Sequence, residues 1–564
     1  MVRKLKIPFL TTLVALMTSL SGCGAVSIDP DLTIDVSNHD DITLKTYFPN
    51  FGCANQKIKR GWLGQEIIRQ TGYNVEFNQF SASMDTEVNK FLNTREPIDM
   101  LKVGGTIFNN YVTLGYFTDL TDVIEKYANV VVKPDGTTFK NLFTQKQWEA
   151  CSYNGRIYAI PEIGHTAMAD QAIVWNTDHL KLIGYDHIPQ TISEIDDALN
   201  KLEAYFGPKN KNYYAFGLYG TIPVNNPLSG AFEVPGEWWV DENGHLQNVI
   251  HSPQWEKYIT WVNSLLNKGL IAGDWVSQSE TNAMNNFVKE NCSAYVATYW
   301  NITSVRNMLI STYQSFPEDM VLTSEKRAYV YGETERVTLK EDGLLGWSVY
   351  VKGDGAFGSV PQERGVVREG PTGVGYYITV PVASCKRAAY VVDWVCKKNT
   401  EQMTITLIAG QEGLHYDYTT KDDPDAIKLN KKEETYVKIY DKFLEDISGM
   451  SQFQTSVNMD IAREWWPVAE AGFDAWNVLV VDEDGKEDSS RVIKNPFATH
   501  PVLPKFAKVD LEAQNFVITQ AQALINVDSS KLKDNLAKAR STYNTRFYNL
   551  CKDEINAWYA SQNS

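Results

Sequence analysis

Three pairs of adjacent aromatic residues are the first candidates for ligand contact. Trp238-Trp239 follows a Pro-Gly-Glu turn, Tyr299-Trp300 precedes an Asn-Ile-Thr step, and Trp465-Trp466 precedes Pro467. Neighbouring side chains in a strand point to opposite faces, so one ring of each pair can be core while the other stays available. An available ring can stack on the CH groups of a sugar. The alternative is that each pair only joins a core to a surface.

Polar side chains follow a predicted strand over residues 98–103. Thr106, Asn109 and Asn110 are expected in the loop after this run. In open α/β sheets, ligands lie beyond the carboxyl ends of the strands, so these three residues are candidates to bind hydroxyl groups. Ordinary loop capping by Thr and Asn is the competing interpretation.

Metal and catalytic motifs are weak or absent in the sequence. The cysteines form no CxxC pair; they stand at positions 23, 53, 151, 292, 385, 396 and 551. A helix over residues 386–399 would separate Cys385 from Cys396 by about 16 Å, so this pair should be free. No GxSxG, HExxH, Walker or SxxK motif stands in a suitable context. We therefore expect no metal, no cofactor and no catalytic residue.

Two further polar signals favour structural roles. The run Asp482-x-Asp484-Gly485-x-Glu487 suggests a calcium loop but lacks the longer ligand series, so a hairpin turn is the better interpretation. His165 has no HExxH context, and we interpret it as a loop residue.

The N-terminus has the pattern of an export signal. Arg3, Lys4 and Lys6 precede an apolar run that stops at Leu20, which is too short for a stable membrane span. The following Ser21-Gly22-Cys23 looks like a bacterial lipobox, which implies cleavage before Cys23 and acylation of its sulfur. Two acyl chains would anchor the protein stably. A plain secretory signal is the alternative.

Charge and length limit the classes of protein to which this chain can belong. Removal of residues 1–22 takes three of the 53 basic residues, which leaves 50 against 69 acidic ones and a formal charge of −19. No cluster of Lys and Arg is available to neutralise phosphates, so we expect no nucleic-acid partner. The mature length exceeds what a single core supports, so two lobes or more are expected.

Hydrophobic periodicity predicts alternating strands and helices in the first half of the chain. Residues 42–47 and 74–80 alternate like strands and flank a helix-like run at 58–70. Further helices are predicted around residues 88–92 and over 119–127, so a parallel-type sheet covered on both faces is expected. Thr191 with Glu194, and Ser252 with Pro253, mark later helix starts.

The sequence of the second half of the chain predicts elements of a different kind from those of the first half. Residues 327–350 are rich in strand formers, a helix is predicted over 386–398, and helices dominate from about residue 505. Residues 23–40 lack sustained periodicity and are predicted to be a tether between lipid and fold.

An ordered set of motifs resembles the extracellular solute-binding proteins of sugar importers. The first is WEACSYNGRIYAIPEI followed by AIVWNTDHLKLIGYDHIPQTISEIDDAL, between residues 148 and 202. These resemble maltodextrin-binding proteins and the long lipoproteins of Gram-positive bacteria. Other resembling segments are TGYNVEF (71–77), GYFTDLTDVIEKYA (115–128), FVKENCSAYVATYW (287–300), GYYITVPVASCKRAAYVVDWV (375–395) and GQEGLHYDY (410–418). The resemblance covers about residues 42–420 and departs at 301–375 and after 420.

This resemblance implies an α/β, two-lobe, periplasmic-binding-protein-like fold of type II, with a hinge between the lobes and a helical C-terminal region. The N-terminal lobe would comprise 41–161 plus about 375–409, and the C-terminal lobe 162–330 plus about 410–564. Residues 331–374 would be a strand-rich insertion of either lobe.

The resemblance also implies a function and further site residues. Glu162 lies in a segment similar to the family's hinge-proximal binding strand, although it could be a solvated hinge charge. The segment that contains Trp300 is similar to the one where the family places an aromatic ring against the sugar. We expect a monomer, lipid-anchored on the extracellular face of the cell membrane, that passes a carbohydrate to the permease subunits of an ABC transporter.

Two other functions compete with this interpretation. A secreted glycoside hydrolase would also use aromatic platforms, but it needs a paired acid and nucleophile or base, and a pair proves nothing among so many carboxylates. The other is a binding lobe that reports to a membrane sensor kinase. The sequence does not separate import from sensing.

Overall fold

The computed structural model describes most of the chain. The described residues are 29–38, 42–49, 61–81, 83–163, 171–220, 227–298, 305, 308, 345–348, 351–361, 367–368, 374–408, 410–418, 429–431, 434–438, 492–493 and 495–563. The predicted signal peptide and Cys23 lie outside them. Among the described residues, no helix has both the length and the apolar character needed to cross a bilayer.

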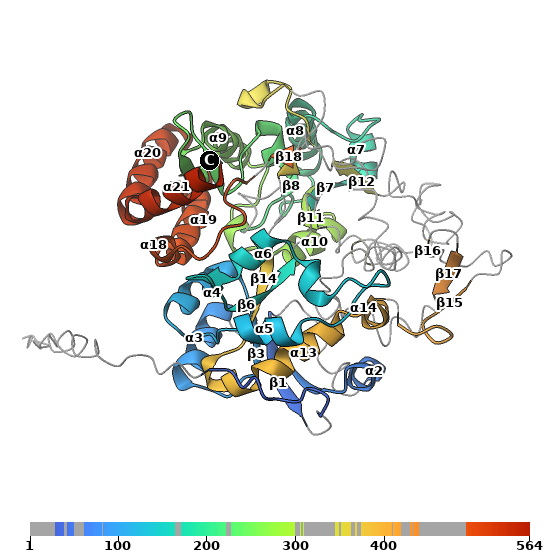
Figure 1. The fold of residues 1–564 in the computed structure, drawn as a ribbon. Coiled ribbons are helices and arrows are strands. Elements are labelled where there is room, and N and C mark those ends of the chain that lie inside the picture. Colours follow the sequence, from blue (N-terminus) through green and yellow to red (C-terminus); the bar gives the residue numbers. More distant parts are fainter. Residues whose placement is uncertain are drawn as a thin grey trace, which may run out of the picture.

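The chain forms two lobes, each built on its own sheet (Figure 1). The strand order of the N-terminal lobe is β2-β1-β3-β14-β6. The bounds of these strands are β1 (Thr43–Phe48), β2 (Asn74–Gln79), β3 (Met100–Val103), β6 (Ala159–Ile163) and β14 (Val374–Thr379). β1 is parallel to β2 and β3, as predicted, whereas β14 is antiparallel to β3 and β6. β14 runs the other way because the chain re-enters this sheet from the other lobe.

Helices cover both faces of the N-terminal sheet. One face packs against α2 (Trp62–Thr71), α5 (Thr121–Tyr127), α13 (Ala388–Lys398) and α14 (Glu401–Ile408). The other packs against α3 (Met84–Thr94) and α4 (Gly105–Thr113), while α6 (Gln145–Ala150) leads into the β4 (Ser152–Tyr153) and β5 (Arg156–Ile157) hairpin. The two faces carry separate apolar clusters.

The C-terminal lobe has the strand order β12-β7-β11-β8. β7 (Gln171–Asn176) is antiparallel to both β12 (Leu345–Ser348) and β11 (Ala294–Thr298), and β11 is parallel to β8 (Phe216–Gly217). This lobe also carries α7 (Thr177–Leu182), α8 (Ile192–Phe206), α9 (Pro253–Asn267) and α10 (Glu280–Val288). The residues of these elements share one apolar core.

Small sheets complete the described fold. β9 (Trp238–Val240) pairs with β10 (Leu246–Asn248), and β13 (Val367–Arg368) pairs with β18 (Val492–Ile493). β17 (Glu434–Lys438) lies between β15 (Tyr416–Tyr418) and β16 (Leu429–Lys431). The predicted strand character of residues 327–350 is confirmed at β12, and most of that stretch lies outside the described residues.

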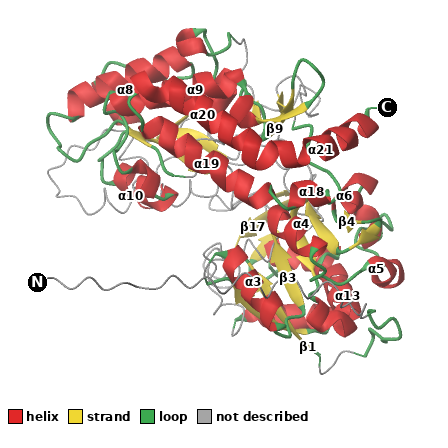
Figure 2. Cartoon of the chain, turned by 90° about the vertical axis from the view of Figure 1, so that its left-hand side faces the viewer, coloured by secondary structure: helices red, strands yellow, loops and turns green. Residues whose placement is uncertain are grey.

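The helical C-terminal region joins the two lobes. It comprises α18 (Pro504–Ala507), α19 (Asp510–Asn526), α20 (Leu532–Tyr543) and α21 (Asn549–Gln562), with a π-turn between the last two. α19 packs on α9 of the C-terminal lobe, and α18 lies against α4 of the N-terminal lobe (Figure 2). Ala507 belongs to an apolar cluster of the N-terminal lobe, whereas Phe506 belongs to the core of the C-terminal lobe.

Two boundaries differ from the sequence prediction. β6 continues to Ile163 and pairs with β14 there, so Glu162 belongs to the N-terminal sheet and not to the C-terminal lobe. His415 packs its ring against Trp62 of α2 at 4.3 Å between centroids, so this part of the chain also stays with the N-terminal lobe. The prediction missed both because each depends on a contact that is distant in sequence.

The predicted tether is also shorter than residues 23–40. Leu32, Ile34 and Val36 pack against the N-terminal core, and Tyr127 donates from its hydroxyl to the carbonyls of Leu32 at 2.9 Å and Ile34 at 2.8 Å. The apolar residues alternate at positions 32, 34 and 36, a short period-two pattern that docks this segment on α5.

Several local predictions are confirmed. Ser252 caps α9 with Pro253 in its first turn, and the helices over 388–398 and from 504 onward are present. Cys385 and Cys396 are both free. Thr191 and Glu194 form the predicted capping box at the start of α8. These features depend on neighbouring residues, which the sequence displays directly.

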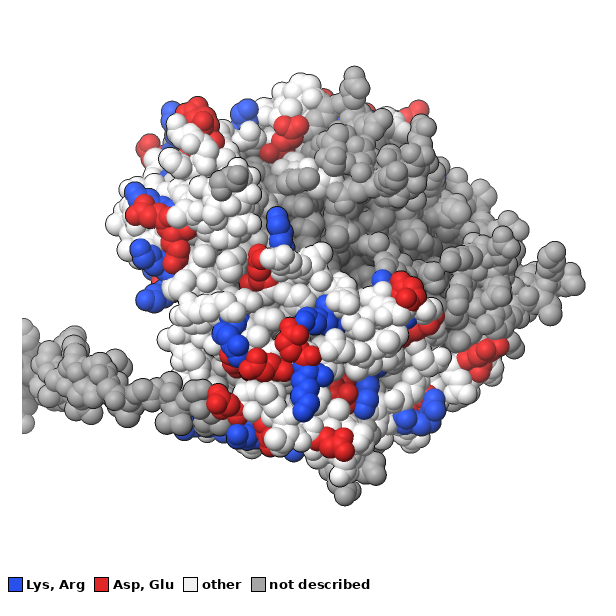
Figure 3. Space-filling view, viewed as in Figure 1, with Lys and Arg blue, Asp and Glu red and all other residues white. Residues whose placement is uncertain are grey.

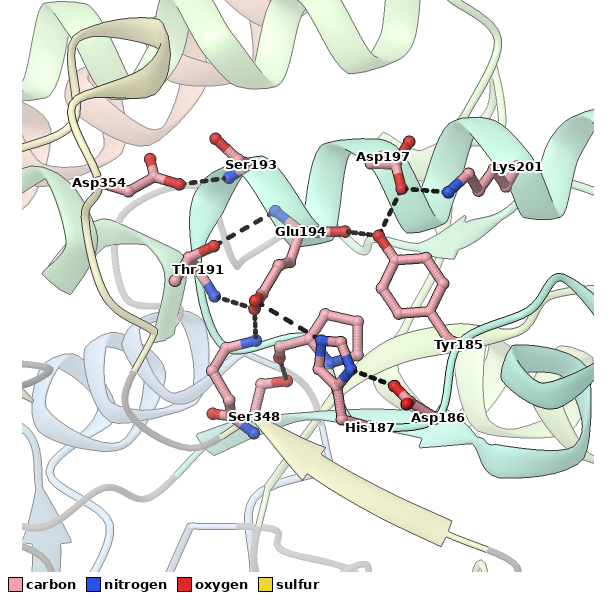
Figure 4. A network of polar contacts seen from close by, with 12 residues as sticks. Tyr185, Asp186, His187, Thr191, Ser193, Glu194, Asp197, Lys201, Ser348 and Asp354 are labelled. Atoms are coloured by element: carbon pink, nitrogen blue, oxygen red, sulfur yellow. Dashed lines mark hydrogen bonds and ion pairs between the residues drawn. The ribbon is translucent and has the colours of Figure 1, made fainter.

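Figure 4 shows how the capping box fixes α8 to the edge of its sheet. The Glu194 carboxylate accepts from the backbone N–H groups of Gln190 at 2.7 Å and Thr191 at 3.1 Å. The Ser348 hydroxyl of β12 donates to the Pro189 carbonyl at 2.5 Å and accepts from the Trp175 indole at 2.7 Å. The loop before α8 is thereby held to β7 and β12.

We expect Thr191→Ala to lower the free energy of unfolding by about 1 kcal/mol, because the Thr191 hydroxyl accepts from the Glu194 N–H at 3.3 Å. Chemical denaturation measures the change. Lys201→Ala on the same helix is the control, since its exposed ion pair with Asp197 should contribute less than about 0.5 kcal/mol. Equal effects of the two substitutions would contradict the role of the cap.

Candidate ligand-binding site

The carboxyl ends of the N-terminal strands meet at one edge of the sheet. β1, β2 and β3 end there, and β6 ends there too because it and β3 are both antiparallel to β14. The next strand along the chain after β6 is β7, the first strand of the other lobe. Ligands of open α/β sheets lie beyond such an edge. The side chains at these strand ends therefore define the candidate site.

A buried ion pair spans the edge. The Lys102 ammonium of β3 lies 2.6 Å from the Glu162 carboxylate of β6, and their side chains are 1% and 6% exposed. The pair reaches across β14, where the Lys102 ammonium also lies 4.7 Å from the centre of the Tyr376 ring. Burial and the nearby Glu162 charge raise the pKa of Tyr376 to about 12. The Tyr376 phenol therefore remains neutral at physiological pH.

A second lysine approaches the same carboxylate from α13. Burial lowers the pKa of Lys398 to about 8; Glu162 opposes this shift, and Lys102 adds to it. The Lys398 ammonium lies 5.9 Å from the ring centre of Phe48, the last residue of β1, and 5.8 Å from that of Trp394. One carboxylate thus faces two ammonium groups at this edge.

The predicted loop after β3 is a helix. Thr106, Asn109 and Asn110 lie on α4, which begins at Gly105 directly after the strand, and not in an irregular loop. Only Thr106 lies in the first turn, near the sheet edge. The sequence prediction failed here because Gly104-Gly105 suggested a loop and offered no side-chain cap.

The Asn109 side chain is already engaged by protein. It is buried and hydrogen-bonds the Asp510 carboxyl of α19, so it links the N-terminal lobe to the C-terminal helices. Burial and the nearby Glu237 charge raise the pKa of Asp510 well above its usual value. Ligand contacts by Thr106, Asn109 and Asn110 stay predictions.

The C-terminal lobe offers polar groups at the strand ends that face the same crossover. Gln171 begins β7 and pairs with Thr298, the last residue of β11. The Glu280 carboxylate accepts from the Thr298 N–H at 2.8 Å and from its hydroxyl at 2.7 Å. The buried Gln171 side-chain oxygen has no hydrogen-bond partner within the described part of the chain. An unsatisfied acceptor of this kind suits a ligand hydroxyl.

Only one of the three aromatic pairs falls within the described residues. Trp238 of β9 is buried and packs edge-on against Phe497 at 5.2 Å and Phe506 at 5.6 Å. Trp239 is partly exposed and donates from its indole to the Asn248 carbonyl at 3.3 Å. The sequence predicted this arrangement, with one ring of the pair in the core and the other partly exposed. Tyr299, Trp300, Trp465 and Trp466 lie outside the described residues, as do His165 and the Asp482–Glu487 run.

A depression of about 600 Å³ lies elsewhere on the C-terminal lobe. It is lined by residues that precede β8 and β11, including Tyr213, Tyr214 and Asn291. It therefore lies at the opposite end of these strands from Thr298, away from the crossover between the lobes. We do not assign the ligand to it.

Comparison with known proteins identifies the class. Residues 63–330 match the family of bacterial extracellular solute-binding proteins. This segment belongs to that family. The predicted family resemblance and the two-lobe fold are thereby confirmed, and the lipoprotein form stays a prediction. A sequence comparison with curated proteins gives no match.

Solved structures similar to this chain share its fold. The alginate-binding protein AlgQ2 is 14% identical, with a TM-score of 0.62 over 93% of this chain and 99% of that one. The S. pneumoniae substrate-binding protein FusA, in complex with fructo-nystose, is 12% identical, with a TM-score of 0.58 over 92% and 99%. A protein from Bifidobacterium longum infantis, described as an HMO-binding solute-binding protein associated with an ABC transporter, is 13% identical, with a TM-score of 0.53 over 92% and 99%.

The sequence predicted Glu162 as a site residue but not its partners. Lys102 stands in an apolar strand run, Lys398 at the end of a helix, and Gln171 at a strand start. A charged residue inside the otherwise apolar run at 98–103 was an available signal, because buried lysines are rare unless paired.

We expect Lys102→Met to lower the free energy of unfolding by about 3 kcal/mol, because Glu162 loses its nearest counter-charge while buried. Guanidinium-induced unfolding measures the loss. Lys45→Met in the same sheet is the matched control. Its ion pair with Glu96 is also short, at 2.8 Å, but both side chains are 29% exposed, so the loss should stay below about 1 kcal/mol. A Lys102→Met protein as stable as the control would contradict a buried, tightly coupled pair.

Proposed function

We propose that this solute-binding protein captures an extracellular oligosaccharide and delivers it to the permease subunits of an ABC transporter. The main support is the arrangement of polar groups at two sheet edges joined by one crossover. Lys102 and Glu162 stand on the N-terminal side, and Gln171 and Thr298 on the C-terminal side. A ligand held between these edges would contact both lobes at once.

The proposed mechanism is a hinge equilibrium. A ligand that contacts both edges binds the closed arrangement better than the open one, and its differential affinity shifts the population toward closure. The chain passes from the N-terminal lobe to the C-terminal lobe between β6 and β7, and it returns before β14. The contact of α18 with α4 provides a further connection between the moving parts. The permease would recognise the closed form.

A saccharide is the favoured ligand class on two grounds. The aromatic pairs can supply ring faces, while amide and carboxyl groups can bond hydroxyls. The similar structures named above are described as alginate-binding, bound to fructo-nystose and HMO-binding, which supports a carbohydrate for this chain. We propose no catalytic step, because capture and release need no bond to be made or broken.

The proposed location is the outer face of the cell membrane, through acylation of Cys23. Leu32 lies nine residues further on and is bonded to Tyr127 of α5. A fully extended chain spans about 3.5 Å per residue, so α5 would stay within about 30 Å of the bilayer surface.

Calorimetry of the mature protein against a panel of oligosaccharides tests this function. We expect at least one saturable ligand, and we expect that ligand to raise the melting temperature as its concentration increases. Trp300→Ala should weaken its affinity at least tenfold if this ring stacks on the sugar.

Chromatography of the same mixtures after several hours serves as the control for catalysis. Unchanged saccharides support a binding protein. Progressive appearance of shorter products would contradict the proposal and favour a glycoside hydrolase.

The described part of the N-terminal lobe carries charges of both signs on the face shown in Figure 3. On the face shown in Figure 3, basic and acidic side chains of the N-terminal lobe are interspersed. Several form ion pairs around α5 and α6, such as Lys140 with Glu125 at 2.5 Å and Arg156 with Asp119 at 2.5 Å. Opposite charges thus lie next to one another on this face.

A further inference from the structure

The C-terminal lobe carries a carboxylate that the protein holds by one oxygen only. Glu280 begins α10, and its Oε1 atom accepts from the Thr298 N–H at 2.8 Å and from the Thr298 hydroxyl at 2.7 Å. Its other oxygen, Oε2, accepts no hydrogen bond from the described residues, and the residue is partly exposed. Glu280 is therefore oriented by the protein and keeps an acceptor for a ligand.

This carboxylate lies on the side of its lobe that faces the N-terminal lobe. Both views show α10 there (Figure 1, Figure 2). Thr298, which orients Glu280, is the last residue of β11 and pairs with Gln171, the first residue of β7. β7 is the first strand of this lobe after β6. A ligand held between the lobes would therefore meet the end of the sheet where Glu280 is fixed.

The Gln171 side chain offers a second unused polar group at this sheet end. It stands directly opposite Thr298, so the Cβ atoms of the two residues are about 5 Å apart and their side chains point to one face. Its amide oxygen is buried without a partner, and its amide nitrogen is neither buried nor bonded to a described residue. A half-turn of the amide exchanges the two atoms, and either can bond a hydroxyl.

The Glu280 charge is not neutralised by a neighbour. Among the described residues it forms no ion pair. Burial first, and then the Glu280 charge, raise the pKa of the Tyr295 phenol well above its usual value, so this neighbour stays neutral. At the opposite edge, the Lys102 side chain is 1% exposed and Lys398 is 6% exposed, whereas Glu280 is partly exposed. A ligand would therefore meet the negative charge of Glu280 more directly than either ammonium.

We propose that Glu280 and Gln171 select a neutral saccharide by bonding neighbouring hydroxyl groups of one sugar ring. The inference rests on the proposed function and narrows its ligand class. A hydroxyl that donates to the free Oε2 atom forms a charge-assisted hydrogen bond, and the two bonds to Thr298 hold the acceptor in place beforehand. A uronic acid ring would instead bring a second carboxylate beside an unpaired one, and this repulsion disfavours acidic saccharides.

Titration calorimetry with three matched pairs of trisaccharides tests the ligand class. The neutral members are cellotriose, galactotriose and mannotriose, and each acidic partner carries a carboxylate in place of every C6 hydroxymethyl group. We expect the mature protein to bind at least one neutral member about tenfold or more tightly than its acidic partner.

Glu280→Gln tests the carboxylate itself. The new amide oxygen can keep both bonds to Thr298, while an amide NH2 group replaces the free acceptor and the charge is lost. We expect the affinity for the tightest-binding neutral trisaccharide to fall about tenfold or more and that for its acidic partner not to fall. A purely structural role of Glu280 would leave the ratio of the two affinities unchanged.

Gln171→Met tests the second group. It removes the amide at nearly constant volume and breaks no hydrogen bond to a described residue, so the variant should fold. The affinity for the same neutral trisaccharide should fall about threefold or more.

Glu256→Gln is the matched control variant. Glu256 and Glu280 both lie in the first turn of a helix of the C-terminal lobe, but Glu256 is paired with Arg540 at 2.8 Å. The substitution removes the same charge from the lobe and should leave every affinity within about twofold of the unaltered protein. Glu280→Gln should melt within about 3 °C of the unaltered protein, because its bonds to Thr298 can persist.

The outcomes separate the two proposals. Tighter binding of an acidic trisaccharide than of its neutral partner, or an equal effect of Glu280→Gln and Glu256→Gln, overturns the selection of a neutral ligand while capture of a saccharide stands. Binding of none of the six probes also overturns it, and the wider oligosaccharide panel then decides separately whether the protein captures a saccharide. If Glu280→Gln melts far lower, Gln171→Met decides, and an unchanged affinity of that variant overturns the inference.

Discussion

The structure depends on one buried charge contact at the place where the chain leaves and re-enters the N-terminal lobe. β14 returns from the other lobe and inserts between β3 and β6, and the Lys102–Glu162 pair spans it at 2.6 Å. Because the pair is almost fully buried, a change in its geometry would cost the carboxylate its nearest counter-charge. The contact therefore holds three strands together. The chain leaves for the C-terminal lobe from β6, and it returns to the N-terminal lobe at β14.

The positions of the candidate site residues follow from this order of the strands. Parallel strands bring their carboxyl ends together, so side chains from β1, β3 and β6 and the start of α4 share one edge. The C-terminal sheet presents Gln171 and Thr298 beside the same crossover. The helices after residue 504 then connect the lobes on another side, through the contact of Asn109 with Asp510. Polar contacts thus occur at both places where lobe movement must be accommodated.

Local signals in the sequence predicted much of the fold, and long-range contacts account for what it could not predict. The capping box at Thr191, the cap at Ser252 and the early strand–helix alternation depend on neighbouring residues and were found. The antiparallel direction of β14 and the pairing of Lys102 with Glu162 join segments far apart in the chain. The helix at residue 105 was missed because a glycine pair without a cap suggests a loop. Among the site residues, Glu162 was found through a family resemblance, and Lys398 had no local signal.

Small-angle scattering of the mature protein tests the central claim most directly, because the account requires two lobes that close around a solute. The measurement compares the free protein with the protein saturated by the saccharide that gives the largest thermal shift. The account predicts that the radius of gyration falls on binding and returns when the saccharide is removed by dialysis. An unchanged radius of gyration at proven saturation would contradict capture by lobe closure.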